Sequence, residues 1–121
     1  MKIILVIEDD LGLQDTYERK LTDEGYEVIK AMTAEGALKE VTNRKPDLIL
    51  LDIMLPGSLN GFDFLKEIKK DDQNSKIPVL VMTNLDTEEE QAKKLGVQGY
   101  FIKANQSIDD VIKNIKITLG S

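Results

Sequence analysis

The sequence contains no cysteine and no histidine among its 121 residues. Without cysteine the chain forms neither a disulfide nor a thiolate metal site, which fits a cytoplasmic protein. Without histidine it carries no Ser-His-Asp triad, no histidine-based zinc site and no phosphohistidine of its own. Chemistry on this chain must therefore use carboxylates, hydroxyls, amides and amines.

Long apolar runs and positive charge are also scarce. The sequence contains no run of about 18 apolar residues, the length needed to cross a bilayer. The apolar stretch at residues 1–7 is too short for a signal peptide and leads into acidic residues. A formal net charge of -6 argues against direct binding of nucleic acid, because phosphates require a basic surface. We expect one globular domain over residues 1–121, without a membrane segment.

Five apolar strand patterns alternate along the chain with five helical patterns. The strand patterns cover residues 2–7, 27–32, 47–51, 78–82 and 99–102. The helical patterns cover about residues 11–24, 34–42, 61–70, 87–96 and 107–119. Strict alternation predicts an α/β fold with a single doubly wound, five-stranded parallel sheet and helices on both faces. The unbroken apolar run at residues 48–51 is typical of a strand buried on both faces.

Several helix starts have capping signals. Thr33 precedes the second helical pattern as an N-cap. Thr87-Glu88-Glu89-Glu90 predicts a capping box at the fourth pattern, and Ser107 begins a weaker variant at the fifth.

Polar side chains follow four of the five strands at the point where each strand ends. The first strand is followed by Glu8, Asp9 and Asp10, the third by Asp52, the fourth by Thr83 and the fifth by Lys103. Each residue alone has an ordinary explanation as a loop acid, a strand-end hydroxyl or a solvated charge. In open α/β sheets, however, ligands bind beyond the carboxyl ends of the strands, so these groups converge on one potential site.

Clustered carboxylates repel one another unless one takes a proton or a cation binds between them. Oxygen ligands without histidine or cysteine favour a hard cation, and Mg²⁺ is the leading choice. Lys103 could then hold an anionic group and Thr83 could donate a hydrogen bond to it. This combination is typical of phosphoryl transfer with Asp52 as the nucleophile.

The motifs ILVIEDD, LILLDIMLPG, VLVMTN and GYFIKA closely resemble the CheY-like receiver domain of two-component response regulators. The resemblance runs from Ile3 to about Leu119 in the family's order and spacing. It implies the flavodoxin-like strand order 2-1-3-4-5. It also implies a signalling domain that catalyses only its own phosphorylation and slow dephosphorylation, and is not otherwise an enzyme.

The resemblance implies that Mg²⁺ is held by Glu8 (often through water in this family), Asp9, Asp52 and the backbone carbonyl of Met54. It further implies that Asp52 is the phosphoacceptor and that Lys103 pairs with the phosphoryl group. Thr83 and Tyr100 would form the switch pair. With no histidine on this chain, the phosphohistidine donor is expected on a sensor histidine kinase or a histidine phosphotransfer protein. The expected docking face is the first helix near Leu11 and Gln14. A downstream protein is expected on the face formed by residues 87–119.

The chain departs from the family pattern at three places. Ala104 replaces the usual proline after Lys103, and a cis bond before a non-proline residue costs about 2.5–4 kcal/mol, which favours a trans bond. Gly61 lies one residue further than usual from Asp52, so the intervening loop is lengthened. Asn84 stands where the family prefers a smaller residue, which narrows access to the site.

Other α/β families fit the residues less well. A dinucleotide-binding domain needs glycines after the first strand, where this chain has EDDLG, and no P-loop motif is present. A haloacid dehalogenase-like phosphatase normally has a second aspartate at the position of Met54. A receiver-like binding module without phosphorylation is the remaining alternative, and failure to bind Mg²⁺ would favour it.

Overall fold

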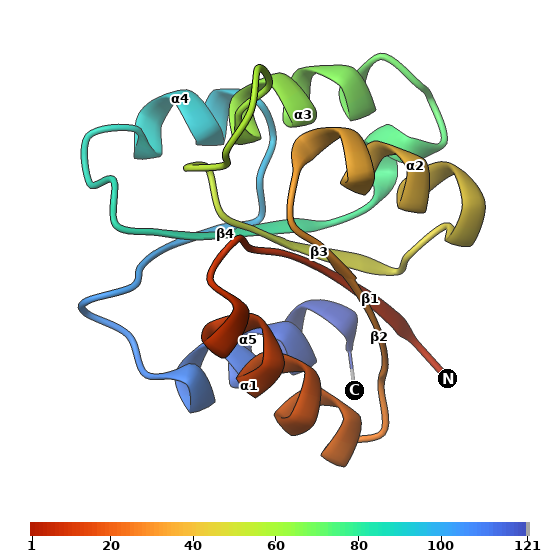
Figure 1. Ribbon diagram of the computed structural model, residues 1–121, viewed down its shortest axis with the longest axis vertical. Helices are drawn as coiled ribbons and strands as arrows, with labels where there is room; N and C mark the ends of the chain where they lie inside the picture. Colours follow the sequence, from red (N-terminus) through yellow and green to blue (C-terminus); the bar gives the residue numbers. More distant parts are fainter. Residues whose placement is uncertain (121) are drawn as a thin grey trace.

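A computed structural model describes residues 1–120 of the protein as a parallel sheet covered by helices on both sides (Figure 1). The strands are β1 (Ile3–Ile7), β2 (Glu27–Ala31), β3 (Leu48–Leu51), β4 (Val79–Thr83) and β5 (Gly99–Ile102). The helices are α1 (Leu11–Asp23), α2 (Ala34–Arg44), α3 (Gly61–Lys69), α4 (Glu89–Lys94) and α5 (Ile108–Leu119), with a short 3-10 turn η1 (Asn74–Lys76). The strand order is β2-β1-β3-β4-β5, so the predicted fold and order are confirmed.

Each face of the sheet builds its own hydrophobic core. Helices α1 and α5 lie on one face and α2, α3 and α4 on the other (Figure 1). Alternate residues of the central strands point to opposite cores: Leu48 and Leu50 join the core under α1 and α5, whereas Ile49 and Leu51 join the other. All four side chains of β3 are fully buried. The residues of β3 are all apolar because both faces of the strand are covered, as the sequence predicts.

The helix starts follow the sequence signals at two of the three expected places. Thr33 and Ser107 accept hydrogen bonds from backbone amides in the first turns of α2 and α5. The predicted capping box at residues 87–90 is wrong. Glu88 is the N-cap of α4 and makes no side-chain capping bond, and the Thr87 hydroxyl instead lies 3.4 Å from Glu88 Oε1. Helix α4 is short, with six residues.

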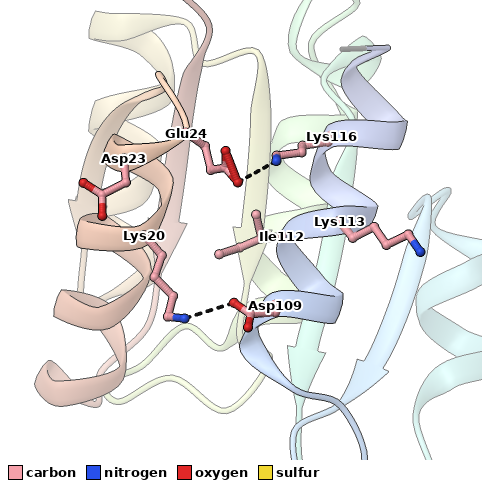
Figure 2. Close-up of a pocket in the computed structure, with 7 residues that line it drawn as sticks. All are labelled: Lys20, Asp23, Glu24, Asp109, Ile112, Lys113 and Lys116. Carbon is pink, nitrogen blue, oxygen red and sulfur yellow. Dashed lines mark hydrogen bonds and ion pairs between the residues drawn. The ribbon is translucent and has the colours of Figure 1, made fainter.

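Helices α1 and α5 are joined across their exposed sides by two ion pairs. Figure 2 shows Lys20 facing Asp109 and Lys116 facing Glu24, with N–O distances of 3.0 and 2.5 Å. These pairs line an open hollow of about 460 Å³ with Ile112 at its floor. Because all four charges are substantially solvated, each pair contributes less than about 1 kcal/mol to stability. None of the strand-end residues lines this hollow, and its acidic and basic side chains balance in charge.

Within residues 1–120, none of the helices is long and apolar enough to cross a membrane. The Lys103–Ala104 bond, which the missing proline had left in question, is trans, as is every other peptide bond in the described part of the chain.

Candidate functional site

The carboxyl ends of β1, β3, β4 and β5 bring the predicted strand-end residues together at one edge of the sheet. Glu8 continues from β1 through a hydrogen bond from its amide to the Ala31 carbonyl, and the Asp52 amide donates to the Ile7 carbonyl (both 3.0 Å). At the other side the Lys103 amide donates to the Thr83 carbonyl at 2.8 Å. Backbone bonding between neighbouring strands thus fixes where each of these side chains begins.

Lys103 joins two of the carboxylates directly. Its Nζ lies 2.9 and 3.0 Å from the two carboxylate oxygens of Glu8 and 2.8 Å from Asp52 Oδ2. Burial by itself lowers the pKa of the Lys103 ammonium, but hydrogen bonds to Asp52 and Glu8 outweigh burial and raise it above its usual value. Lys103 is therefore a firmly charged cation, held between Glu8 and Asp52.

Three acidic side chains form a cluster that fits a divalent cation. Glu8, Asp9 and Asp52 each present a carboxylate oxygen, and these oxygens lie within 4.8 Å of one another. Glu8 and Asp52 are buried, whereas Asp9 is exposed. Oxygen donors of this kind match the preference of Mg²⁺, which binds through a few carboxylates and keeps several waters. At Met54 the backbone amide donates to Asp52 Oδ1 at 3.0 Å, while the role of the Met54 carbonyl stays a prediction.

The buried Glu8 carboxyl has a strongly altered acidity. Burial raises its pKa from 4.5 to about 7; the hydrogen bond from Lys103 opposes this shift, and the nearby charge of Asp52 adds to it. Two acids share one lysine, so the local charge is only partly offset within the chain. A cation bound between the carboxylates would favour the ionised form of Glu8.

This altered acidity predicts how the stability of the metal-free protein depends on pH. Between about pH 4.5 and pH 7 the folded protein keeps the Glu8 proton that the unfolded chain has lost, so stability decreases as the pH rises through this window. We expect a decrease of about 1–3 kcal/mol in the free energy of unfolding. Urea titrations in chelator from pH 5 to 8 would measure it. A Glu8→Gln variant should lack this decrease, and an unchanged slope in that variant would contradict the assignment.

Thr83 and Tyr100 are connected through one loop residue, Leu85. Thr83 is fully buried, and its hydroxyl oxygen accepts a hydrogen bond of 3.4 Å from the Leu85 amide. The half-buried Tyr100 donates its hydroxyl to the Leu85 carbonyl. A displacement of Thr83 can therefore reach the Tyr100 ring through the loop after β4. The resemblance pairs Thr83 with Tyr100, but no sequence signal identifies Leu85 as the residue between them.

Gly61 allows the loop after Asp52 to close tightly against the site. Its amide donates to the Ile53 carbonyl at 2.9 Å. A Cβ atom at this position would lie 2.5 Å from Ile53 Cα and 2.9 Å from the Asp52 carbonyl oxygen, both of them backbone atoms. Only glycine lets the first turn of α3 approach the backbone that carries Asp52 so closely.

An open groove of about 660 Å³ lies beside the acidic cluster. Asp9 lies at its border, and Met54 and Leu85 are among the apolar residues that line it. Half of the Met54 side chain is exposed. Met54 lies two residues after Asp52, and Leu85 lies two residues after Thr83. Both positions therefore place an apolar side chain in this groove.

The prediction that Gln14 belongs to an exposed docking face is wrong. Gln14 is only 3% exposed, whereas Leu11, predicted for the same face, is 57% exposed. Gln14 lies three residues before Tyr17 and seven before Leu21, which are the other buried residues of α1. This helical spacing was a signal for burial, but the polar character of glutamine concealed it.

Comparisons with known proteins agree with this geometry. The family model for the response regulator receiver domain matches residues 4–116 of this chain. The transcriptional regulatory protein AfsQ1 of Streptomyces coelicolor is 35% identical over 108 residues, which are 88% of this chain and 46% of that protein. Sporulation initiation phosphotransferase F of Bacillus subtilis is 35% identical over 116 residues, 93% of this chain and 90% of that protein.

A solved structure, the non-phosphorylated HemR receiver domain of Leptospira biflexa, has a TM-score of 0.88 at 27% identity and covers 100% of this chain and 96% of its own. The chain thus spans less than half of AfsQ1 but almost all of phosphotransferase F and of the HemR domain. The fold, the strand-end residues and the matched sequence pattern agree, and the chain belongs to the receiver domains of two-component response regulators.

Proposed function

We propose that Asp52 is the phosphoacceptor of this receiver domain, in a reaction that requires Mg²⁺. The observation that carries the proposal is the position of Asp52: a buried carboxylate at the end of a buried strand, beside two further acids and 2.8 Å from the ammonium of Lys103. A carboxylate is costly at such a place unless its charge has a use.

Several residues of the chain take separate roles in phosphoryl transfer. The Met54 amide and Lys103 hold the two oxygens of Asp52 at 3.0 and 2.8 Å, which orients the carboxylate. An Asp52 oxygen attacks the phosphorus and forms the new O–P bond, while the bond to the leaving group breaks and the leaving group takes the electron pair. Lys103 and the Thr83 hydroxyl then hold oxygens of the transferred group.

The metal would be held by Glu8, Asp9, Asp52 and the backbone carbonyl of Met54. When bound, Mg²⁺ supplies positive charge that offsets the phosphoryl oxygens and the carboxylates in the same place. Glu8 must lose its proton to serve as a ligand, and Lys103 must leave Glu8 to reach the phosphoryl group.

None of the 121 residues is a histidine, so this domain cannot supply the phosphohistidine donor itself. We infer a phosphohistidine on a sensor histidine kinase or a histidine phosphotransfer protein, and a downstream protein that binds the face of α4, β5 and α5. The chain acts on itself alone, as acceptor and as catalyst of its own slow dephosphorylation.

Intact mass spectrometry tests the proposal. Incubation with a small acyl phosphate and Mg²⁺ should add one phosphoryl group to the protein, and chelator should prevent the addition. An unmodified protein at saturating donor and Mg²⁺ would contradict the proposal and favour a binding module. Repeated turnover of a phosphate ester would instead indicate a phosphatase.

A Thr83→Ala variant is expected to remain able to accept a phosphoryl group on Asp52, because Asp52 and Lys103 are intact, but to lose the signal to Tyr100. The phosphoryl group attracts the Thr83 hydroxyl, which releases the Leu85 amide and so disturbs the loop whose carbonyl holds the Tyr100 hydroxyl. In the parent, phosphorylation should shift the NMR signals of the Tyr100 ring and of the α4 amides. Removing the hydroxyl uncouples the two events, because a ligand shifts an equilibrium only through its differential affinity for the two states.

A Thr118→Ala variant is a matched control for this experiment, since the Thr118 hydroxyl donates to the Asn114 carbonyl within α5, in a helix away from the relay. It should keep the phosphorylation-induced shifts of Tyr100. If Thr83→Ala shows the same shifts as the parent, the Thr83–Tyr100 relay is wrong.

A further inference from the structure

Gln14 is a buried polar side chain that the proposed chemistry does not use. Among residues 1–120 the buried polar or charged side chains are Glu8, Gln14, Asp52 and Thr83. The other three belong to the strand-end site. Gln14 lies in the first turns of α1, immediately after the acidic turn, and is 3% exposed. A buried amide is costly unless it is hydrogen-bonded, so its contacts indicate its role.

The Gln14 amide joins the ends of two strands. Its Nε2 donates to the Glu8 carbonyl at 3.1 Å and to the Ala31 carbonyl at 3.0 Å. Both partners are acceptors, so the amino group and not the oxygen must face them. The Ala31 carbonyl also accepts from the Glu8 amide at 3.0 Å, and the Gln14 backbone amide donates to the Asp10 carbonyl at 2.9 Å. The Gln14 side chain therefore holds the turn at the Glu8 carbonyl, while the backbone amide of the same residue makes an ordinary helical bond on the other side of Asp9.

Asp9 depends on this turn for its position. It is exposed, so its carboxylate is not held by packing as those of Glu8 and Asp52 are. Nevertheless one of its oxygens lies within 4.8 Å of oxygens from both partners. The Glu8 carbonyl, held by Gln14, belongs to the peptide unit that enters Asp9. The Asp10 carbonyl, bonded to the Gln14 backbone, lies just beyond it.

We propose that Gln14 is a positioning residue for the magnesium ligands: its side-chain amide holds the Glu8–Asp10 turn so that the Asp9 carboxylate points at Glu8 and Asp52. The proposal rests on the proposed function of the acidic cluster. The Gln14 amino group donates to two backbone carbonyls and to no carboxylate of the acidic cluster, so it acts through the backbone of the turn. Mutation of residues that orient metal ligands without binding the metal typically lowers metal affinity by about 10–100-fold.

A Gln14→Met variant tests the role, because methionine keeps the length of the side chain and removes the donor. We expect the dissociation constant for Mg²⁺, measured by calorimetric titration without phosphodonor, to rise by about tenfold or more. The Mg²⁺ concentration for half-maximal phosphorylation should rise in parallel, while the rate at saturating Mg²⁺ stays close to the parental rate. In chelator, the Asp9 and Asp10 amide NMR signals should shift.

Two control variants separate positioning from general loss of stability. In Gln98→Met a side-chain amide is also lost: Gln98 Oε1 accepts from the Val79 amide at 2.7 Å, at the opposite edge of the sheet. In Val41→Ala a buried side chain of α2 is shortened, which lowers the melting temperature without changing the site. Both controls should bind Mg²⁺ with parental affinity and keep the Asp9 and Asp10 amide signals.

The outcomes are distinct. Parental Mg²⁺ affinity in Gln14→Met, or an equal loss of affinity in Val41→Ala, would overturn the role of Gln14. Failure of the parent itself to bind Mg²⁺ would instead overturn the proposed function. In that case the metal-free amide signals still decide: shifts in Gln14→Met alone support the positioning of the turn, and unchanged signals overturn it.

Discussion

Replacing Asp52 by asparagine is expected to abolish Mg²⁺-dependent phosphorylation of the protein. In the parent, Lys103 and the Met54 amide donate to the Asp52 carboxylate at 2.8 and 3.0 Å. Asparagine has nearly the same shape, and its oxygen can still accept a hydrogen bond from one of these donors. Its amide, however, is a far weaker nucleophile than a carboxylate. Intact mass spectrometry after incubation with an acyl phosphate should show no added phosphoryl group, while thermal unfolding shows that the variant is folded.

Asp10→Asn is a matched control for this loss. Asp10 lies beside the acidic cluster and accepts from the Leu13 amide at 3.1 Å as the N-cap of α1. Asparagine caps a helix about as well as aspartate, so this variant should fold and be phosphorylated. It removes one negative charge near the site without removing the proposed acceptor. Modification that survives Asp52→Asn, or that is lost equally in Asp10→Asn, would contradict the assignment of Asp52.

The fold could be predicted because its signals agree at several levels. The apolar residues of β3 are explained by burial on both faces, and alternation of strands with helices leaves few topologies. The strand-end residues followed from topology, since parallel strands present their carboxyl ends at a common edge. Glu8, Asp52 and Lys103 meet there, as the sequence indicated.

Details that depend on competing hydrogen bonds could not be predicted. The Thr87 pattern fitted a capping box, but its hydroxyl lies near the Glu88 carboxylate instead of capping α4. Gln14 has the helical spacing of a buried residue but the polarity of an exposed one. Its burial is possible because its amino group donates to two backbone carbonyls. Similarly, the sequence predicts an anionic ligand as the partner of Lys103, whereas the structure also pairs its ammonium with two acids of the chain.

The phosphorylated protein is expected to lose its phosphoryl group slowly, because the residues two positions beyond Asp52 and Thr83, Met54 and Leu85, are apolar. Met54 and Leu85 line the groove beside the acidic cluster, two residues beyond Asp52 and Thr83. Hydrolysis of an aspartyl phosphate needs a water in line with the phosphorus, and polar side chains orient such a water. A thioether and an isobutyl group cannot do so, and both help to exclude water.

A Met54→Asn, Leu85→Glu double variant should therefore dephosphorylate about tenfold faster or more, since general-base assistance commonly exceeds that factor. The decay would be followed by mass spectrometry after removal of the donor, with Mg²⁺ present throughout. Gln91→Glu is the control, because it places a new negative charge in the same groove but on α4. If the double variant decays no faster than the parent, apolar exclusion of water does not set the lifetime. If Gln91→Glu decays equally fast, negative charge and not the orientation of water is the cause.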